Sequence, residues 1–143
     1  MGNNNSYKLN NIILSQSTFE RNNMIDSSDE IINALNIDVE NTVKNEIVLV
    51  KLIVTLTGKS SDTGKDNFDF KVSYVGEWSM GENPQPPLEI FTKMNAPAII
   101  FPFIREHIAG ISLKAGLDPL FLPTINFSQA AKEKNNDISK NED

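Results

Sequence analysis

The chain has 143 residues, the length of one domain built around a single hydrophobic core. Hydrophobic residues make up 39% and charged residues 22%, a composition typical of folded globular proteins rather than disordered ones. The net charge is −6, from 13 Lys and Arg against 19 Asp and Glu, which opposes binding to nucleic acids and to anionic membrane surfaces.

The absence of cysteine excludes disulfides, thiolate catalysis and cysteine-based metal sites. The first residues, MGNNNSYKLN, lack the basic start and the apolar stretch of a secretory signal. No apolar run approaches the roughly 18 residues that a membrane-spanning helix needs. We therefore expect a cytoplasmic protein without a membrane segment.

Three segments carry strand signals. Residues 7–19 show an imperfect apolar alternation. In residues 47–56 every second residue, from Val48 to Leu56, is apolar and lies on the same face. Residues 67–80 alternate almost without exception, with Phe68, Phe70, Val72, Tyr74 and Trp78 on the same side. The intervening segment, GKSSDTGK at 58–65, has the composition of a hairpin loop, so we expect its two flanking strands to be antiparallel neighbours.

The segment 21–36 is ambiguous. Ser27 and Glu30 form a possible capping box, which favours a short helix, but an extended linker fits as well. After it, Ile37 and Val39 alternate with Asp38 and Glu40. Residues 1–6 are polar and expected to be flexible, residues 7–127 form the predicted domain, and residues 128–143 are expected to be a loose polar tail.

The pattern changes after the proline-rich segment 81–87. Apolar residues recur at helical spacing from Ile100 to Ala115, and Gly116 is placed to cap the helix. Pro102 lies inside this pattern, so we expect a kink there or a helix that begins near Phe101. Residues 117–127 are extended and more apolar than an ordinary surface loop.

No motif for catalysis or metal binding is present. The single histidine, His107, lies on the apolar stripe of the predicted helix, where packing or an interface is its expected role. Gly58, Lys59 and Ser60 imitate the end of a phosphate-binding loop, but Ile53 stands where its first glycine belongs. We expect no catalytic residue, no metal and no cofactor.

The apolar side chains exceed what one sheet and one helix obviously cover. Such a surplus indicates an oligomer interface or a groove for another polypeptide. A single monomeric α+β core that closes over all of these residues is the alternative, and a catalytic or small-ligand pocket under the helix is a third.

The helical region and the segment after it resemble the SecB protein-export chaperones. The resemblance rests on two motifs: a helix start and a "P.N/INF" ending, carried by Ile100, Phe101, Pro102, Phe103, Arg105, Glu106 and Ile108, and by Pro123, Ile125, Asn126 and Phe127. Weaker similarity covers YKLNNIILSQSTFE and the alternation at 37–40, and the order of elements agrees.

The resemblance implies an α+β fold with a four-stranded antiparallel sheet, one long helix packed across it, and a homotetramer built as a dimer of dimers. It implies an ATP-independent holdase that binds unfolded polypeptides in hydrophobic grooves during protein export, with SecA as a partner in many members. A chaperone dedicated to one client such as an antitoxin, and a non-chaperone interaction module, remain alternatives.

The resemblance also assigns residues to sites. The client-binding residues are Phe68, Phe121, Leu122, Ile125 and Phe127. The oligomer interface consists of Phe70, Val72, Tyr74, Phe103 and His107.

The surface that binds SecA in the family departs from the family pattern. Asp69 and Lys71 replace a leucine and a glutamate, and Gln16 replaces one acid of a pair, which leaves Glu20 as a possible remnant of the docking site. These departures weaken the case for SecA as a partner.

Overall fold

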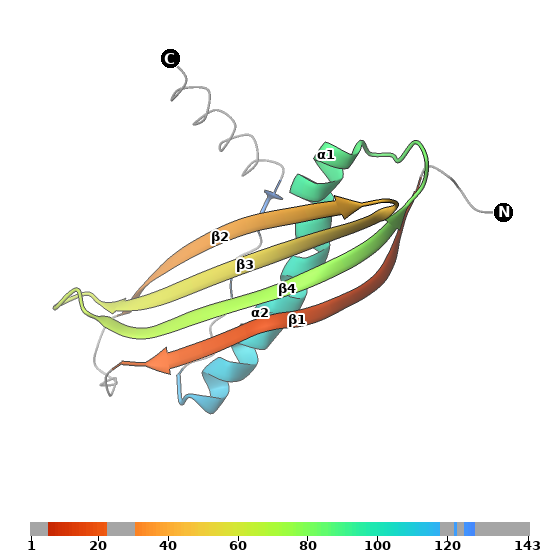
Figure 1. Cartoon of the computed structure of the whole chain (residues 1–143). Helices are drawn as coiled ribbons and strands as arrows, with labels where there is room; N and C mark the ends of the chain where they lie inside the picture. Colours follow the sequence, from red (N-terminus) through yellow and green to blue (C-terminus); the bar gives the residue numbers. More distant parts are fainter. Residues whose placement is uncertain (1–5, 23–30, 118–121, 123–124, 128–143) are drawn as a thin grey trace, which may run out of the picture.

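The computed structural model describes residues 6–22, 31–117, 122 and 125–127. Its four strands are β1 (Tyr7–Arg21), β2 (Ile31–Lys44), β3 (Ile47–Ser60) and β4 (Asp66–Met80). The helical part comprises α1 (Leu88–Ile90), a π-helical turn (Phe91–Asn95) and α2 (Ala96–Lys114). The strands form one antiparallel sheet in the order β1-β4-β3-β2, and α2 crosses one face (Figure 1). The predicted fold class is confirmed.

The core lies between α2 and the face of the sheet that carries the even-numbered residues of β3 and β4. Alternate residues of a strand share a face, and here that face is apolar in both central strands. Its buried side chains are Val48, Val50, Leu52, Val54, Leu56, Phe68, Phe70, Val72 and Trp78. The helix contributes Ile100, Ile104 and Ile108 from one stripe. The predicted buried faces of 47–56 and 67–80 are thus confirmed.

The start of β2 differs from the sequence-based expectation. Residues 31–36 belong to β2, so neither a helix nor a linker is correct there; residues 23–30, with the capping-box pair, lie outside the described residues. Pairing with the long apolar strand β3 outweighs local propensity, because it sets Leu35 against Leu56 and Ile37 against Val54.

The hairpin between β3 and β4 is shorter than predicted, because Gly58, Lys59 and Ser60 continue β3. Gly58 stands opposite Phe68, and the Phe68 ring lies over it so closely that an added Cβ would come within 2.2 Å of ring carbons. The glycine therefore makes room for an aromatic ring across the strand pair rather than bending the chain. The antiparallel pairing of the two strands is confirmed.

The helical region begins earlier than predicted. It starts at Leu88, and α2 runs through Pro102 without ending. Pro102 and Ala98, whose carbonyl the missing N–H would have bonded, are both exposed, so water can solvate that carbonyl. The prediction of a start near Phe101 was wrong because Phe91, about three turns upstream, also packs in the core against Trp78.

The helix ends as predicted. Gly116 has φ +74, its N–H bonds the Leu113 carbonyl, and the Leu117 N–H bonds the Ser112 carbonyl. This pair of hydrogen bonds defines a Schellman cap. The helical run Leu88–Lys114, 27 residues long, is apolar enough by length and composition to cross a membrane, and one of its faces is packed on the sheet.

Candidate functional site

The helix α2 crosses behind all four strands (Figure 1) but packs most closely on β3 and β4, so parts of the apolar face on the two outer strands remain exposed. On the β2 side Leu35 and Val43 are 36% and 38% exposed, and Ile37 and Val39 are half-buried. We call Ile31, Leu35, Ile37, Val39 and Val43 the β2 margin. They share the core face because they stand opposite buried or helix-facing residues of β3.

A second apolar region lies on the β1 side. Leu9 and Leu14 are each 45% exposed and stand opposite Trp78 and Tyr74, on the same face as α2. From the helix, Phe103 is 43% exposed, and its ring lies 6.0 Å from the Tyr74 ring. We call Leu9, Leu14, Tyr74 and Phe103 the β1 margin.

Polar contacts fasten β1 to the helix within this region. The Ser17 hydroxyl lies 2.7 Å from His107 Nε2, and the His107 ring packs edge-on against Tyr74. Further along, Arg21 donates a hydrogen bond of 2.7 Å to the Ala115 carbonyl at the end of α2. Burial, and secondarily the charge of Glu106, raise the pKa of Tyr74. The β1 margin is therefore held in one geometry.

The predicted client-binding residues are largely packed inside the described chain. Phe68 is only 2% exposed, lying over Gly58 with its edge toward Phe70. Leu122 and Phe127 are buried, Phe127 packs edge-on against Phe101, and Ile125 is half-buried. Phe121 lies outside the described residues. Direct client contact by these residues stays a prediction.

The predicted interface residues divide into two sets. Phe70 and Val72 are buried beneath α2, and Phe70 packs against Phe19 of β1. Tyr74, Phe103 and His107 come together at the β1 margin and keep exposed surface. The even-residue periodicity of 67–80 could not separate the sets, because it does not show where the helix cover ends.

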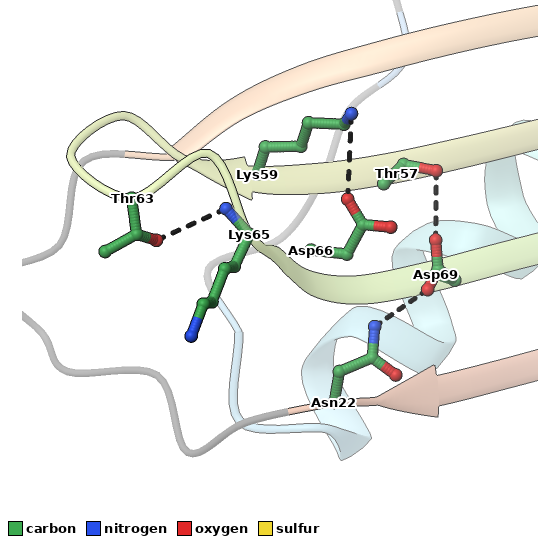
Figure 2. Close-up of polar contacts among 7 residues, drawn as sticks. All are labelled: Asn22, Thr57, Lys59, Thr63, Lys65, Asp66 and Asp69. Atoms are coloured by element: carbon green, nitrogen blue, oxygen red, sulfur yellow. Dashed lines mark hydrogen bonds and ion pairs between the residues drawn. The ribbon is translucent and has the colours of Figure 1, made fainter.

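The other face of the sheet carries Glu20 and mixes polar side chains with three exposed apolar ones, Ile13, Ile32 and Leu49. Asp69 stands directly opposite Glu20, so the face holds two adjacent carboxylates. Thr57 and Asn22 donate hydrogen bonds of 3.0 and 2.8 Å to the two Asp69 oxygens, as Figure 2 shows. Sequence comparison along one strand missed this pairing, since Asp69 reaches Glu20 only across the β1–β4 register. Lys71, the next outward residue on β4, adds a positive charge.

The described surface offers apolar area for binding another polypeptide. Within residues 6–22, 31–117, 122 and 125–127, no cluster of three or more His, Cys, Asp or Glu could hold a metal ion. The two margins offer apolar area. Because their exposed side chains are already more than half buried, covering one of them would contribute about 0.5–1.5 kcal/mol to binding.

Fold and surface together define a sheet-and-helix protein with exposed apolar margins. The family described as "Preprotein translocase subunit SecB" matches residues 7–137, and the chain belongs to this family. The predicted resemblance is confirmed.

Two curated relatives are named protein-export protein SecB. The one from Nitrobacter winogradskyi is 29% identical over 93 residues, 65% of this chain and 57% of the relative. The one from Methylobacillus flagellatus is 28% identical over 99 residues, 69% of this chain and 63% of the relative. The match thus spans about six tenths of each relative's length.

A solved structure shares the fold. It is a SecB-like chaperone of Mycobacterium tuberculosis in complex with a ChAD peptide from the HigA1 antitoxin. The TM-score is 0.74 at 13% identity, over 83% of this chain and 90% of that one.

Proposed function

We propose that this protein is an ATP-independent holdase chaperone that binds unfolded polypeptides through the β2 margin beside α2. One observation carries the proposal: large apolar side chains on the core face of the sheet at β2, among them Leu35 and Val43, remain exposed. Unfolded chains expose the apolar side chains that such a surface can cover. Membership in the SecB family supports the same role.

We place this activity in the cytoplasm and in protein export, without a cofactor or catalytic step. The curated relatives, both named protein-export proteins, support export. A role dedicated to one client is the second candidate, because the similar M. tuberculosis chaperone is bound to an antitoxin peptide. The acidic surface, with a net charge of −6, favours basic clients in either role.

The proposal assigns no SecA docking to this chain. Glu20 and Asp69 provide two carboxylates, but Asp69 stands where SecA-binding members carry a leucine, and Lys71 reverses the charge of a glutamate. A positive charge next to an acidic pair weakens its attraction for a basic partner.

We also propose that four copies assemble as a dimer of dimers and that the β1 margin forms one of the two interfaces that such a tetramer requires. The exposed side chains of this margin, Leu14 and Phe103 above all, are too large and too close together for a surface that stays in water. Light scattering after gel filtration should give the tetramer mass. Replacing Phe103 by aspartate should reduce that mass, whereas the same replacement of Leu113, equally a helix residue and 62% exposed, serves as the control.

Aggregation of a reduced, unfolding test protein provides the test of function. Stoichiometric amounts of the protein, without nucleotide, should suppress the light scattering of the aggregating client. A single stable complex with one folded partner and no effect on unfolded chains would instead support an interaction module and contradict the holdase.

A further inference from the structure

Strand β2 forms an open edge of the sheet. Among the residues that the structure describes, it pairs with β3 alone, through an unbroken register along all 14 of its residues. The opposite edge, β1, is interrupted by two register shifts, between Leu9 and Asn11 and between Leu14 and Gln16. Bulges of this kind are one way in which proteins keep an edge from pairing with other chains. Strand β2 lacks that protection.

The turn after β2 shows which backbone groups face outward. Asn45, with φ 57, and Glu46 connect β2 to β3, and Lys44 is paired with Ile47. In a two-residue hairpin, the two residues that flank the turn form hydrogen bonds with each other through their N–H and C=O groups. In the next pair, both residues direct these groups away from the partner strand. Counting back from Lys44, the odd-numbered residues of β2 direct their N–H and C=O toward the open edge.

The same odd-numbered residues carry the β2 margin. Leu35, Ile37 and Val39 lie on the core face of the sheet, which α2 covers over β3 and β4. Their partners on β3 are Leu56, Val54 and Leu52. The even-numbered Asp38 and Glu40 are exposed on the other face. In the described part of the chain, the edge therefore combines outward-directed N–H and C=O groups, the apolar β2 margin on one face, and the carboxylates of Asp38 and Glu40 on the other.

We propose that β2 binds an extended client segment as a fifth strand of the sheet, with a preference for segments in which apolar residues alternate with Lys or Arg. This inference rests on the proposed function and names the client class. The apolar residues of the segment lie beside the β2 margin, and the basic residues lie beside Asp38 and Glu40. If the bound segment shifted by one residue along β2, its apolar side chains would lie beside the carboxylates and its basic side chains beside the β2 margin. The alternating pattern therefore fixes the register of the segment.

Peptides test the pattern on the unmodified full-length protein. One peptide of about nine residues alternates isoleucine and lysine, and a second has the same composition with the two residue types in separate blocks. Fluorescence anisotropy should show roughly tenfold tighter binding of the alternating peptide. Equal affinity would overturn the proposal.

N-methylation of the alternating peptide tests backbone pairing. Only alternate residues of an added strand direct their N–H toward β2. Methylation of one set, the isoleucines in antiparallel pairing or the lysines in parallel pairing, should weaken binding roughly tenfold. Methylation of the other set should leave the affinity unchanged. Equal effects of both sets would rule out strand addition.

A variant on the protein side removes one outward N–H. Asn41→Pro changes no apolar residue of the β2 margin and should lower the peptide affinity, whereas Asn41→Ala keeps the N–H and should not. If Asn41→Pro lowers the mass of the assembly and leaves peptide affinity unchanged, β2 pairs with a second copy and the proposal is wrong.

If Asn41→Pro fails to fold, hydrogen exchange of the unmodified protein tests whether the peptide pairs with β2. In the unmodified protein, the alternating peptide should slow exchange of the Ile37, Val39 and Asn41 amides; unchanged exchange would contradict the proposal. Suppression of client aggregation without these effects would refute the fifth strand and leave the holdase function standing. Absence of suppression would refute the function itself.

Discussion

Strand β1 is attached to the helix by side chains along its length, whereas β2 is attached to the sheet by its pairing with β3. Tyr7 stacks on Phe91, Ser17 contacts His107, and Arg21 bonds the Ala115 carbonyl. The helix packs most closely on β3 and β4, and the side chains of the β2 margin remain half-buried or exposed. The comparison separates a fixed edge suited to assembly from an open edge suited to variable partners.

Truncation of a core residue that packs against β1 should lower stability far more than truncation of a residue on the β2 margin. Phe70→Ala removes a buried ring that packs against Phe19 and Phe68, and should lower the free energy of unfolding by about 3–5 kcal/mol. Leu35→Ala on the β2 margin should cost less than about 1.5 kcal/mol, because Leu35 is already 36% exposed. Urea unfolding measures both values. Equal losses would show that the β2 margin is covered in the folded protein.

Charge on the β2 margin should reduce client binding. Leu35→Asp should weaken the affinity for an unfolded client roughly tenfold, since a carboxylate replaces apolar contact surface. Leu49→Asp is the matched control, because Leu49 is also 36% exposed but stands opposite Glu77 on the other face. Titration of a labelled unfolded client reports both affinities. A larger effect at Leu49 would move the binding surface to the outer face.

Substitutions at the end of α2 test whether the helix cap stabilises the contact between α2 and β1. Gly116→Ala forces a Cβ into φ +74 beside the carbonyl that Arg21 bonds, and should lower stability by about 1 kcal/mol. Gly110→Ala, inside α2 with no atom within 4 Å of the added Cβ, should raise stability by up to about 1 kcal/mol. Thermal unfolding compares the two variants. A stabilising Gly116→Ala would contradict the assigned cap.

The smallest expected effect concerns alkaline pH. Because the pKa of Tyr74 is raised above its ordinary value of 10.0, the unfolded chain loses this proton first as the pH rises. The resulting contribution to stability is complete below pH 10 and is lost as the pH rises through the folded-state pKa. Urea unfolding of Tyr74→Phe between pH 9 and 11 should show a weaker pH dependence than the original protein. An identical dependence would exclude Tyr74 as its source.

Sequence patterns predicted the central strands and the helix cap well. Unbroken alternation from Phe68 to Trp78 admits one solution, and Gly116 meets a backbone requirement that few other residues satisfy. The start of β2 was missed because apolar residues do not alternate in 31–36, so that its strand structure depends on pairing with β3. The pairing of Glu20 with Asp69 was likewise invisible along the chain, since it depends on a register interrupted by two shifts.

The fold prediction is confirmed, whereas the predicted client-binding residues stay a prediction. Family resemblance selected Phe68, Leu122 and Phe127, all of which are buried in the described chain. Their burial also makes Phe68→Ala a poor test of client binding, because it would uncover Gly58 and open a cavity. The exposed residues of the β2 margin were missed because exposure depends on where α2 stops covering the sheet.

The central claim is that apolar surface left uncovered beside α2 holds unfolded polypeptides. It is tested most directly by light scattering of a reduced, aggregating client mixed with stoichiometric protein in the absence of nucleotide. The account predicts suppression of scattering by the original protein and by Leu49→Asp, with reduced suppression by Leu35→Asp. Scattering that rises as fast with the original protein as without it would contradict the account.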